Sequence, residues 1–469
     1  MLDSSLSEKT VFGGAGILPR ASAALHVQRL TAAGGMVMTG LRILLPLTVV
    51  SILAGCLSAG TDSSVEYTAP DPGPRQSATV SLGAPFVVDI GAMGLPTYND
   101  GSREVHFFPD GHIGVSWDAT NNTAQIFWAE YVSFVTSGID VESSMGAQQV
   151  LGEEPATGAF GEGVSDTGNR SRPEDFDNSG SWLMSAFRVN PGTFELNPHS
   201  RHLIGFYHGE DHWFTDASGS REGESYYHTP TAWMAIGRTR SSDSGLTWSR
   251  DGMIVGMPDC KPPYPSSHTH PSKGPFGGIG NHSAVLDQRT EPDNPAWVLF
   301  FPLIDETGIG VGHGITAVRS NDPEGSYGSW YSYYAGGFDI LQHENIGKHS
   351  ALPGLDGGYS GLNPFALSNP SVHWNLVLDR WVLVAATWDR KRIMISFSRD
   401  ASIVSGWTRP VVLYEPPAGR TVRYATIIGL DANSYLSSTE IGGDAEMFWA
   451  EFDESSKREA MGASVLFRN

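Results

Sequence analysis

The sequence predicts an all-β protein of the propeller type, on three observations. Glycine (55 residues) and proline (29 residues) are abundant among the 469 positions, and aromatic residues make up 10% of the chain. Short apolar runs alternate with turn residues, and none sustains the 3.6-residue period of a helix. A turn motif recurs at intervals of tens of residues, which indicates an array of similar sheets. We expect five blades, with six compact blades as the alternative.

The expected strands are rich in Val, Ile, Phe, Trp and Tyr, residues that favour a pleated, half-buried surface. Three other stretches, 139–181, 257–281 and 339–366, are rich in Gly, Pro, Ser and His and are expected to form long loops over one face, where propeller sites lie. The clearest expected strands are His112–Trp117, Gln125–Trp128, Trp182–Phe187, His202–Tyr207, Trp233–Arg238, Trp297–Leu303, Gly314–Arg319, Trp381–Thr387, Ile393–Ser398 and Met447–Phe452.

The turn motif is complete once, at Ser241–Trp248, which matches the Asp-box pattern S-x-D-x-G-x-T-W. We expect its Ser and Asp to bind turn amides, its Gly to take a positive φ, and its Trp to pack between blades. Two degenerate copies follow the same kind of strand. One runs from Ser320 to Trp330 and the other from Ser398 to Trp407.

These repeats, together with Asn369–Asn375 before an expected strand, resemble the sialidase-like and five-bladed glycoside hydrolase propellers. The resemblance covers most of the chain after residue 84, and it implies a propeller fold that handles carbohydrate. The motifs indicate no single family, and the Arg-Ile-Pro of a sialidase is absent. Because the Asp-box marks a turn remote from the active face, it is no indication of catalysis.

The N-terminal region has the pattern of a bacterial lipoprotein signal. Arg42 precedes an apolar run of about a dozen residues, too short to cross a bilayer of about 30 Å as a helix. The run ends in Leu53-Ala54-Gly55-Cys56, which resembles a lipobox with Cys56 as the lipidated residue. We expect export and a lipid anchor at the cell envelope, in the outer membrane of a Gram-negative cell. The expected segments are a mis-annotated upstream extension (1–35), a signal peptide (36–56), a flexible tether (57–83) and a single propeller domain (84–469).

Charge and cysteine content narrow the range of partners. The formal net charge of −21 disfavours nucleic acid, whose phosphates require clustered Lys and Arg. With Cys56 lipidated, the second cysteine, Cys260, has no partner for an intrachain disulfide. Phosphate-binding glycine loops and Cys/His zinc spacings are absent from the sequence, so we expect no cofactor and no metal. We expect a monomer that binds a glycan or oligosaccharide.

Hydrolysis of a glycosidic bond needs two carboxyl groups, and a propeller supplies them from innermost strands of different blades. Candidates are therefore acids at the ends of such strands. Asp89 is expected to open the first blade, and Asp305 ends an apolar strand. Glu210 and Asp211 lie in His208–His212, the densest group of ionisable residues.

The expected substrate-binding residues surround these acids. His208, His212 and Trp213 come from the same cluster, where Trp213 is placed to stack on a sugar ring. Ligation of a metal by the cluster is the alternative. His282 follows a glycine-rich approach, Asp389 ends a strand in a basic turn, and Arg423 opens the last blade. The full set of binding candidates is His208, His212, Trp213, His282, Asp389 and Arg423.

Three functions are compatible with these residues. The leading hypothesis is a surface-anchored glycoside hydrolase with two channel-facing carboxylates. The second is a polysaccharide lyase, in which a His or Tyr removes a proton next to a uronate. The third is a propeller that binds a glycan or a protein without catalysis. Fold alone does not decide among them, because function depends on the site.

Overall fold

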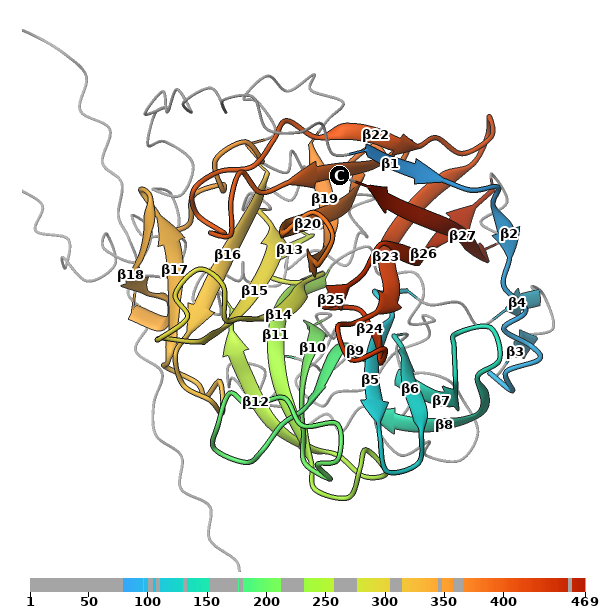
Figure 1. Ribbon diagram of the computed structural model, residues 1–469, viewed down its shortest axis with the longest axis horizontal. Helices are drawn as coiled ribbons and strands as arrows, with labels where there is room; N and C mark the ends of the chain where they lie inside the picture. Colours follow the sequence, from blue (N-terminus) through green and yellow to red (C-terminus); the bar gives the residue numbers. More distant parts are fainter. Residues whose placement is uncertain are drawn as a thin grey trace, which may run out of the picture. The chain divides into compact units, whose positions relative to one another are not determined.

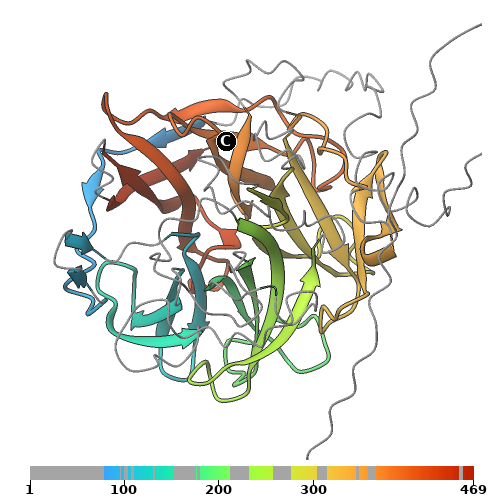
Figure 2. The same cartoon turned by 180° about the vertical axis from the view of Figure 1, so that it is seen from behind.

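The computed structural model describes an all-β propeller with no α-helix among its described residues. Four-stranded or larger sheets radiate from a central axis, and Figure 1 shows β5, β9, β14 and β23 near the centre and β1, β8, β12 and β22 at the rim. Figure 2 shows the same ring from behind. The described residues are 79–95, 97–99, 104–106, 110–129, 133–151, 176, 180–211, 232–256, 276–303, 314–344, 348–356, 366–453 and 458–468.

Each of the five blades has four main antiparallel strands, so the expectation of five blades is confirmed. Blade 1 comprises β5 (Gly114–Asp118), β6 (Thr123–Trp128), β7 (Ser133–Gly138) and β8 (Met145–Leu151). Blade 2 comprises β9 (Gly180–Arg188), β10 (Leu203–Asp211), β11 (Ala232–Ser241) and β12 (Ser249–Val255), and blade 3 comprises β14 (Ser283–Asp287), β15 (Ala296–Pro302), β16 (Ile315–Ser320) and β17 (Trp330–Tyr334). Blade 4 comprises β19 (Leu367–Asn375), β20 (Arg380–Thr387), β21 (Ile393–Phe397) and β22 (Val411–Tyr414), and blade 5 comprises β23 (Thr421–Leu430), β26 (Asp444–Phe452), β27 (Arg458–Arg468) and β1 (Thr79–Leu82).

Shorter elements extend these blades or lie between them. All three of the expected loop stretches contain strands, because the outermost strands are polar and exposed and carry little apolar signal. The shorter elements are β2 (Phe86–Val87), β3 (Thr97–Asn99), β4 (Glu104–His106), β13 (Phe276–Gly278), β18 (Gly337–Leu341), β24 (Leu436–Ser437), β25 (Glu440–Ile441) and a 3-10 turn at Gln342–Glu344.

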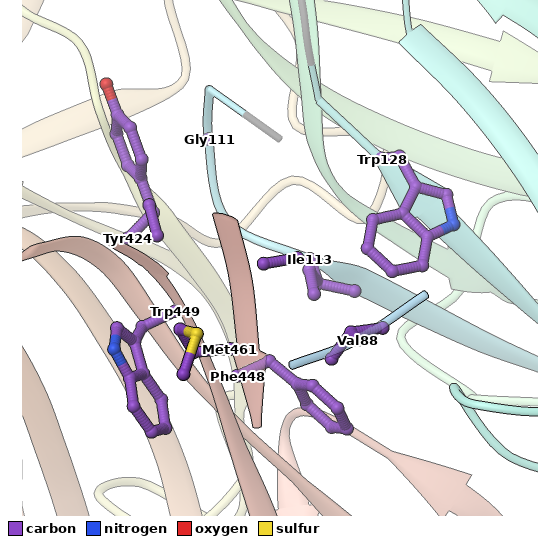
Figure 3. A pocket seen from close by; sticks show the side chains of 10 residues that line it. Val88, Gly111, Ile113, Trp128, Tyr424, Phe448, Trp449 and Met461 are labelled. Atoms are coloured by element: carbon purple, nitrogen blue, oxygen red, sulfur yellow. The ribbon is translucent and has the colours of Figure 1, made fainter. Parts of the chain in front are cut away.

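The ring is closed by the N-terminal strand. β1 pairs with β27 in register Thr79 to Arg468, so the first strand of the chain is the outermost strand of the last blade. Residues 79–82, expected to belong to the tether, are therefore part of the last blade, where they cover an open sheet edge. Figure 3 shows the seam between blades 5 and 1, a small apolar pocket that includes Val88, Ile113, Trp128 and Phe448.

The turn at Ser241–Trp248 connects β11 to β12 and is held by its own side chains. Ser241 Oγ accepts a hydrogen bond from the Gly245 amide at 2.8 Å, and Asp243 accepts one from the Thr247 amide at 2.9 Å. Gly245 takes a φ of +88°, which a residue with a Cβ rarely adopts. Asp322 and Asp400 cap the corresponding turns of blades 3 and 4 through the amides of Ser326 and Ser402.

A tryptophan from each of these turns packs on the preceding blade. Trp248 lies edge-on to Phe127 of blade 1 with ring centroids 5.9 Å apart. Trp330 does the same to Phe206 of blade 2 at 5.8 Å, and Trp407 to Phe300 of blade 3 at 6.3 Å. These contacts occupy equivalent positions in consecutive blades. Each joins a blade to the preceding one by burying aromatic surface.

Candidate functional site

The five innermost strands, β5, β9, β14, β19 and β23, all begin at one face of the ring, here called the front face. The opposite face, which carries the turns described above, is the rear face. At the front end, β9, β19 and β23 each contain one extra residue relative to the neighbouring strand, which is a β-bulge. Bulges re-aim side chains and are frequent beside active sites.

The backbone is also strained at the front end of the innermost strands. Asn281 just before β14, Asn369 in β19 and Tyr424 in β23 have φ values of +52°, +50° and +55°. They occupy the same place in three consecutive blades. A positive φ is unfavourable for residues other than glycine, above all for a Tyr, and such residues cluster at functional sites.

His208 lies at the front end of β10 and is buried between two blades. Its Nδ1 accepts a hydrogen bond from the Asn281 amide at 3.1 Å, so the proton of the neutral ring is on Nε2. Nε2 then donates to Glu210 Oε1 at 3.0 Å. A Cβ on Gly280 would lie 2.2 Å from Nδ1, so only a glycine permits this approach. The ring of Trp182 packs on His208, with centroids 5.1 Å apart.

Two more buried histidines lie in the channel beneath this cluster. Burial lowers the pKa of His112 to about 3, and its Nδ1 lies 3.1 Å from Thr426 Oγ1 on blade 5. Burial also lowers the pKa of His282 well below the usual value, and the imidazoles of His208 and His112 add to the effect. Within the described part of the chain, neither ring nitrogen of His282 makes a hydrogen bond of normal geometry. Both rings are therefore neutral at pH 7.

Below them the channel is narrow and polar. One small pocket is lined by residues from all five blades, and its hydroxyl groups come from the innermost strands and from the connection before β25. These are Ser185, Ser283, Ser371, Thr426, Ser438 and Thr439.

Two carboxylates lie at the front ends of adjacent blades, a region here called the mouth. Glu210 belongs to blade 2, and Asp110 precedes the innermost strand of blade 1 with its Oδ1 3.4 Å from Nη1 of Arg458. Each carboxylate side chain is 16% exposed. A small buried cluster of Ala129, Trp182 and Met184 connects the two residues. The Asp110 amide donates a hydrogen bond to the Ala129 carbonyl, and Trp182 packs on His208, which is the partner of Glu210.

Blade 5 adds a basic and aromatic side to the mouth. Tyr424 lies edge-on to His112 at 6.0 Å, and Figure 3 shows its hydroxyl turned away from the apolar side chains of the seam. Burial raises the pKa of Tyr424 above its usual value, and the charge of Asp110 acts in the same direction. The guanidinium carbon of Arg423 lies 5.5 Å from the ring of Phe452, and that of Arg458 lies 5.0 Å from the same ring.

The structure brings His208, Glu210, His282 and Arg423 of the predicted set to this mouth. Asp89, expected on the first innermost strand, is instead exposed in a turn after β2, where it accepts a hydrogen bond from the Ala92 amide at 3.0 Å. The expectation fails because the chain before β5 belongs to the closing blade and its surroundings. Asp389 lies in the β20–β21 turn and accepts hydrogen bonds from Thr387 Oγ1 at 2.6 Å and the Lys391 amide at 3.1 Å.

Other predicted residues lie outside the described residues. These are Asp305, His212, Trp213 and the lipidation candidate Cys56. The backbone of Asp211 is the last position of β10, opposite Trp233, and its side chain is outside the description. Over the described ranges, no group of three or more His, Cys, Asp or Glu is placed to hold a metal ion, and no helix is long and apolar enough to cross a membrane.

Asp110 is the residue that the sequence reasoning missed. Asp110 meets the criterion of an acid at the start of an innermost strand, and the strand after it was expected. A signal was present in Asp110-Gly111-His112 directly before that strand. Gly111 allows the backbone to approach blade 2, since a Cβ there would lie 2.7 Å from Ala129 Cβ and 3.0 Å from Met184 Cε.

No protein-family model and no curated protein matches the sequence. Among solved structures, the chain is similar to an α-L-arabinofuranosidase from Lactobacillus brevis, with 8% identity and a TM-score of 0.41 over 76% of this chain and 90% of that one. A family 117 glycoside hydrolase from Zobellia galactanivorans has 9% identity and a TM-score of 0.40, covering 83% and 90%. A GH43 endo-arabinanase from Bacillus licheniformis has 12% identity and a TM-score of 0.36, covering 78% and 95%. Values this low carry no information on activity, which has to come from the chain's own residues.

Proposed function

We propose that the protein is a glycoside hydrolase whose catalytic site is the front mouth of the channel. The observation that carries this proposal is the placement of Asp110 and Glu210 at the mouth, on adjacent blades, each partly buried and each held by a basic side chain. Two carboxyl groups flanking one site are the minimum that glycosidic bond cleavage requires.

The surroundings of the two carboxyl groups suggest different roles. Asp110 is paired with the permanently charged guanidinium of Arg458, an environment that suits a base or nucleophile. The partner of Glu210 is an imidazole, which orients the carboxyl group by a hydrogen bond and is a group able to exchange protons. We therefore assign Glu210 as the general acid and Asp110 as the base or nucleophile. Trp182, His282 and Asn281 shape the site around them.

The test is turnover of a panel of oligosaccharides by Asp110→Asn and Glu210→Gln. Each variant is expected to lose about 10²–10⁴-fold in kcat, the usual contribution of a general acid or base. Asp89→Asn is the control, because Asp89 is exposed in the turn after β2 and caps that turn through the Ala92 amide, and it is expected to keep full activity. Unchanged turnover in both mouth variants would overturn the assignment.

The same panel separates the other two hypotheses. A lyase gives an unsaturated product that absorbs in the ultraviolet, whereas a hydrolase gives a new reducing end. Because burial raises the pKa of Tyr424, its hydroxyl stays protonated at neutral pH, and in a lyase it would act as a proton donor. A binding propeller gives saturable glycan binding with no product of either kind.

We also propose that the chain is anchored by a lipid on Cys56, with the catalytic mouth turned away from the membrane. The support is the direction of β1. Thr79 pairs with Arg468, at the rear end of blade 5, whereas Phe452 and Arg458 pair at the front end. The segment that follows Cys56 therefore joins the propeller on the rear face. Cys56→Ser is expected to abolish incorporation of radiolabelled palmitate and to release the protein from membranes. Retained labelling would contradict the anchor.

A further inference from the structure

Arg423 differs from three other arginines at the front of blades 4 and 5, each of which has a carboxylate partner. Arg392 pairs with Glu415, Arg420 with Glu451 and Glu459, and Arg458 with Asp110. Among the described residues, Arg423 has no carboxylate partner. The chain carries 51 acidic residues against 30 basic ones, so an arginine without an acid is unexpected in it.

Aromatic rings hold Arg423 in its place. Its guanidinium carbon lies 5.5 Å from the ring of Phe452 and 6.0 Å from that of Tyr424. The contact to the Tyr424 hydroxyl is 3.5 Å, at the limit of a hydrogen bond. A guanidinium has five N–H donors, and stacking on a ring uses its faces and leaves the donors at its edge. The side chain is thus positioned without its charge being neutralised.

The backbone beside Arg423 is strained. Arg423 immediately precedes the bulge in β23, and the next residue, Tyr424, takes a positive φ of +55°. Strain of this kind persists where the surrounding structure enforces it, and it is concentrated at binding and catalytic sites.

Arg423 is also close to the proposed catalytic residues. Tyr424 contacts Arg423 on one side and His112 on the other, and Asp110 lies near enough to raise the pKa of Tyr424. The turn between β20 and β21 adjoins the same strand, since the Val422 amide donates to the Arg390 carbonyl at 2.8 Å. That turn contains Asp389, Arg390 and Lys391.

We propose that Arg423 forms an anion subsite beside the catalytic carboxylates, and that the substrate is an acidic glycan whose sugar carries a carboxylate or a sulfate group there. This inference rests on the proposed function for its setting. A planar guanidinium with its edge donors unpaired is suited to two parallel hydrogen bonds to either group. Because the rest of the protein is negatively charged and repels an acidic sugar, we expect such a sugar to be attracted at this side of the mouth.

The experiment measures binding of single sugars to the full chain by calorimetry. The probes are glucuronic acid and galactose 6-sulfate, with glucose and galactose as their neutral counterparts. Each acidic sugar that fits is expected to bind more tightly than its neutral counterpart, and Arg423→Gln is expected to weaken that binding about 10–100-fold with neutral sugars unaffected. Tighter binding of the uronate or of the sulfated sugar identifies the acidic group.

Two variants control for fold. Arg423→Lys keeps the charge but not the planar fork, so an intermediate loss is expected. Arg289 also lies over an aromatic ring, 5.0 Å from Trp374, but it is paired with Glu440, so Arg289→Gln is expected to leave sugar binding unchanged. Equal loss in Arg289→Gln and Arg423→Gln overturns the subsite, as does equal binding of acidic and neutral sugars or no binding of either.

Failure of the subsite and failure of the hydrolase are distinguishable. If acidic sugars bind through Arg423 while no glycan is cleaved, the anion subsite is supported and the proposed hydrolase activity is refuted. If glycans are cleaved and the KM for acidic glycans is unchanged in Arg423→Gln, the hydrolase is supported and the anion subsite is refuted.

Discussion

The two faces of the propeller use polar residues in opposite ways. On the rear face, Ser241 and Asp243 satisfy the amides of their own turn, and Arg188 is ion-paired with Asp118 across blades 1 and 2 at 3.1 Å. On the front face, Nε2 of His112 and both ring nitrogens of His282 are buried without a hydrogen bond of normal geometry among the described residues. Positive φ values at residues other than glycine fall in tight turns on the rear face, as at Asn122 and Ser244, but at the start of three consecutive innermost strands on the front face.

This difference indicates a division of labour, in which the rear face contributes mainly to stability and the front face mainly to function. Buried polar groups without partners and strained residues cost stability, and proteins keep them where function requires them. The rear turns instead contribute stability through satisfied hydrogen bonds and buried tryptophans. A variant on the rear face should therefore act mainly on folding, and a variant at the mouth mainly on activity.

The largest effect on stability is expected from Trp330→Ala. The Trp330 side chain is 1% exposed, packs on Phe206 and donates from Nε1 to the Gly325 carbonyl at 3.1 Å. Its removal should lower the free energy of unfolding by about 3–5 kcal/mol, as measured by urea denaturation. The neighbouring Tyr331 is 38% exposed, so Tyr331→Ala should stay within about 1 kcal/mol of the wild type. Equal losses in the two variants would contradict the role of the rear tryptophans.

A moderate effect is expected from pH, because of the neutral histidines at the mouth. In the unfolded chain a histidine is protonated below about pH 6.5, whereas the pKa of folded His112 is about 3. Between these values the unfolded state binds more protons, so the free energy of unfolding falls as pH falls, by up to about 1.4 kcal/mol per pH unit for each such histidine. His112→Gln should reduce this slope between pH 6 and pH 4, as measured by urea denaturation at each pH.

The control for the pH effect is a histidine on the opposite face. His199 lies exposed in the connection between β9 and β10, so His199→Gln should leave the slope unchanged. An unchanged slope in His112→Gln as well would show that His112 is not neutral and buried in the folded protein.

The smallest effect on stability is expected where two residues have the same backbone conformation on different faces. Asn369 at the mouth and Asn122 in the rear turn between β5 and β6 have φ values of +50° and +53°. Replacement of either by Gly relieves strain but adds freedom to the unfolded chain, so each should change the unfolding free energy by less than about 1 kcal/mol. Turnover should fall only in Asn369→Gly. A fall in both variants, or in neither, would remove the functional distinction between the faces.

The apolar strands were predictable from sequence because they are the middle strands of the blades. All ten expected strands overlap observed ones, and most of these pair on both sides with apolar residues on both faces. The innermost strands were harder to recognise. Residues that line the channel, such as Ser283, Ser371 and Thr426, are small and polar, so β14, β19 and β23 lack the apolar signal. The stretch Asn369–Asn375, expected to precede a strand, is itself most of β19.

The site was predictable only in part, for a related reason. His208, Glu210, His282 and Arg423 were recognisable as ionisable residues beside strands. Their grouping was not, because it depends on which strand is innermost, and this depends on closure. Closure by β1 shifts the first blade to Gly114 and makes Asp110, rather than Asp89, the acid at its mouth. The side-by-side position of Asp110 and Arg458 joins residues from opposite ends of the propeller.

The most direct test of the central claim measures kcat and the free energy of unfolding on one set of variants. The set is Asp110→Asn and Glu210→Gln at the mouth, with Trp330→Ala at the rear. The division of labour predicts that the two mouth variants lose about 10²–10⁴-fold in kcat and stay within about 1 kcal/mol of wild-type stability, while Trp330→Ala loses stability and keeps its kcat where it is folded. Full turnover in Asp110→Asn and Glu210→Gln, on any glycan that the wild type cleaves, would contradict the claim.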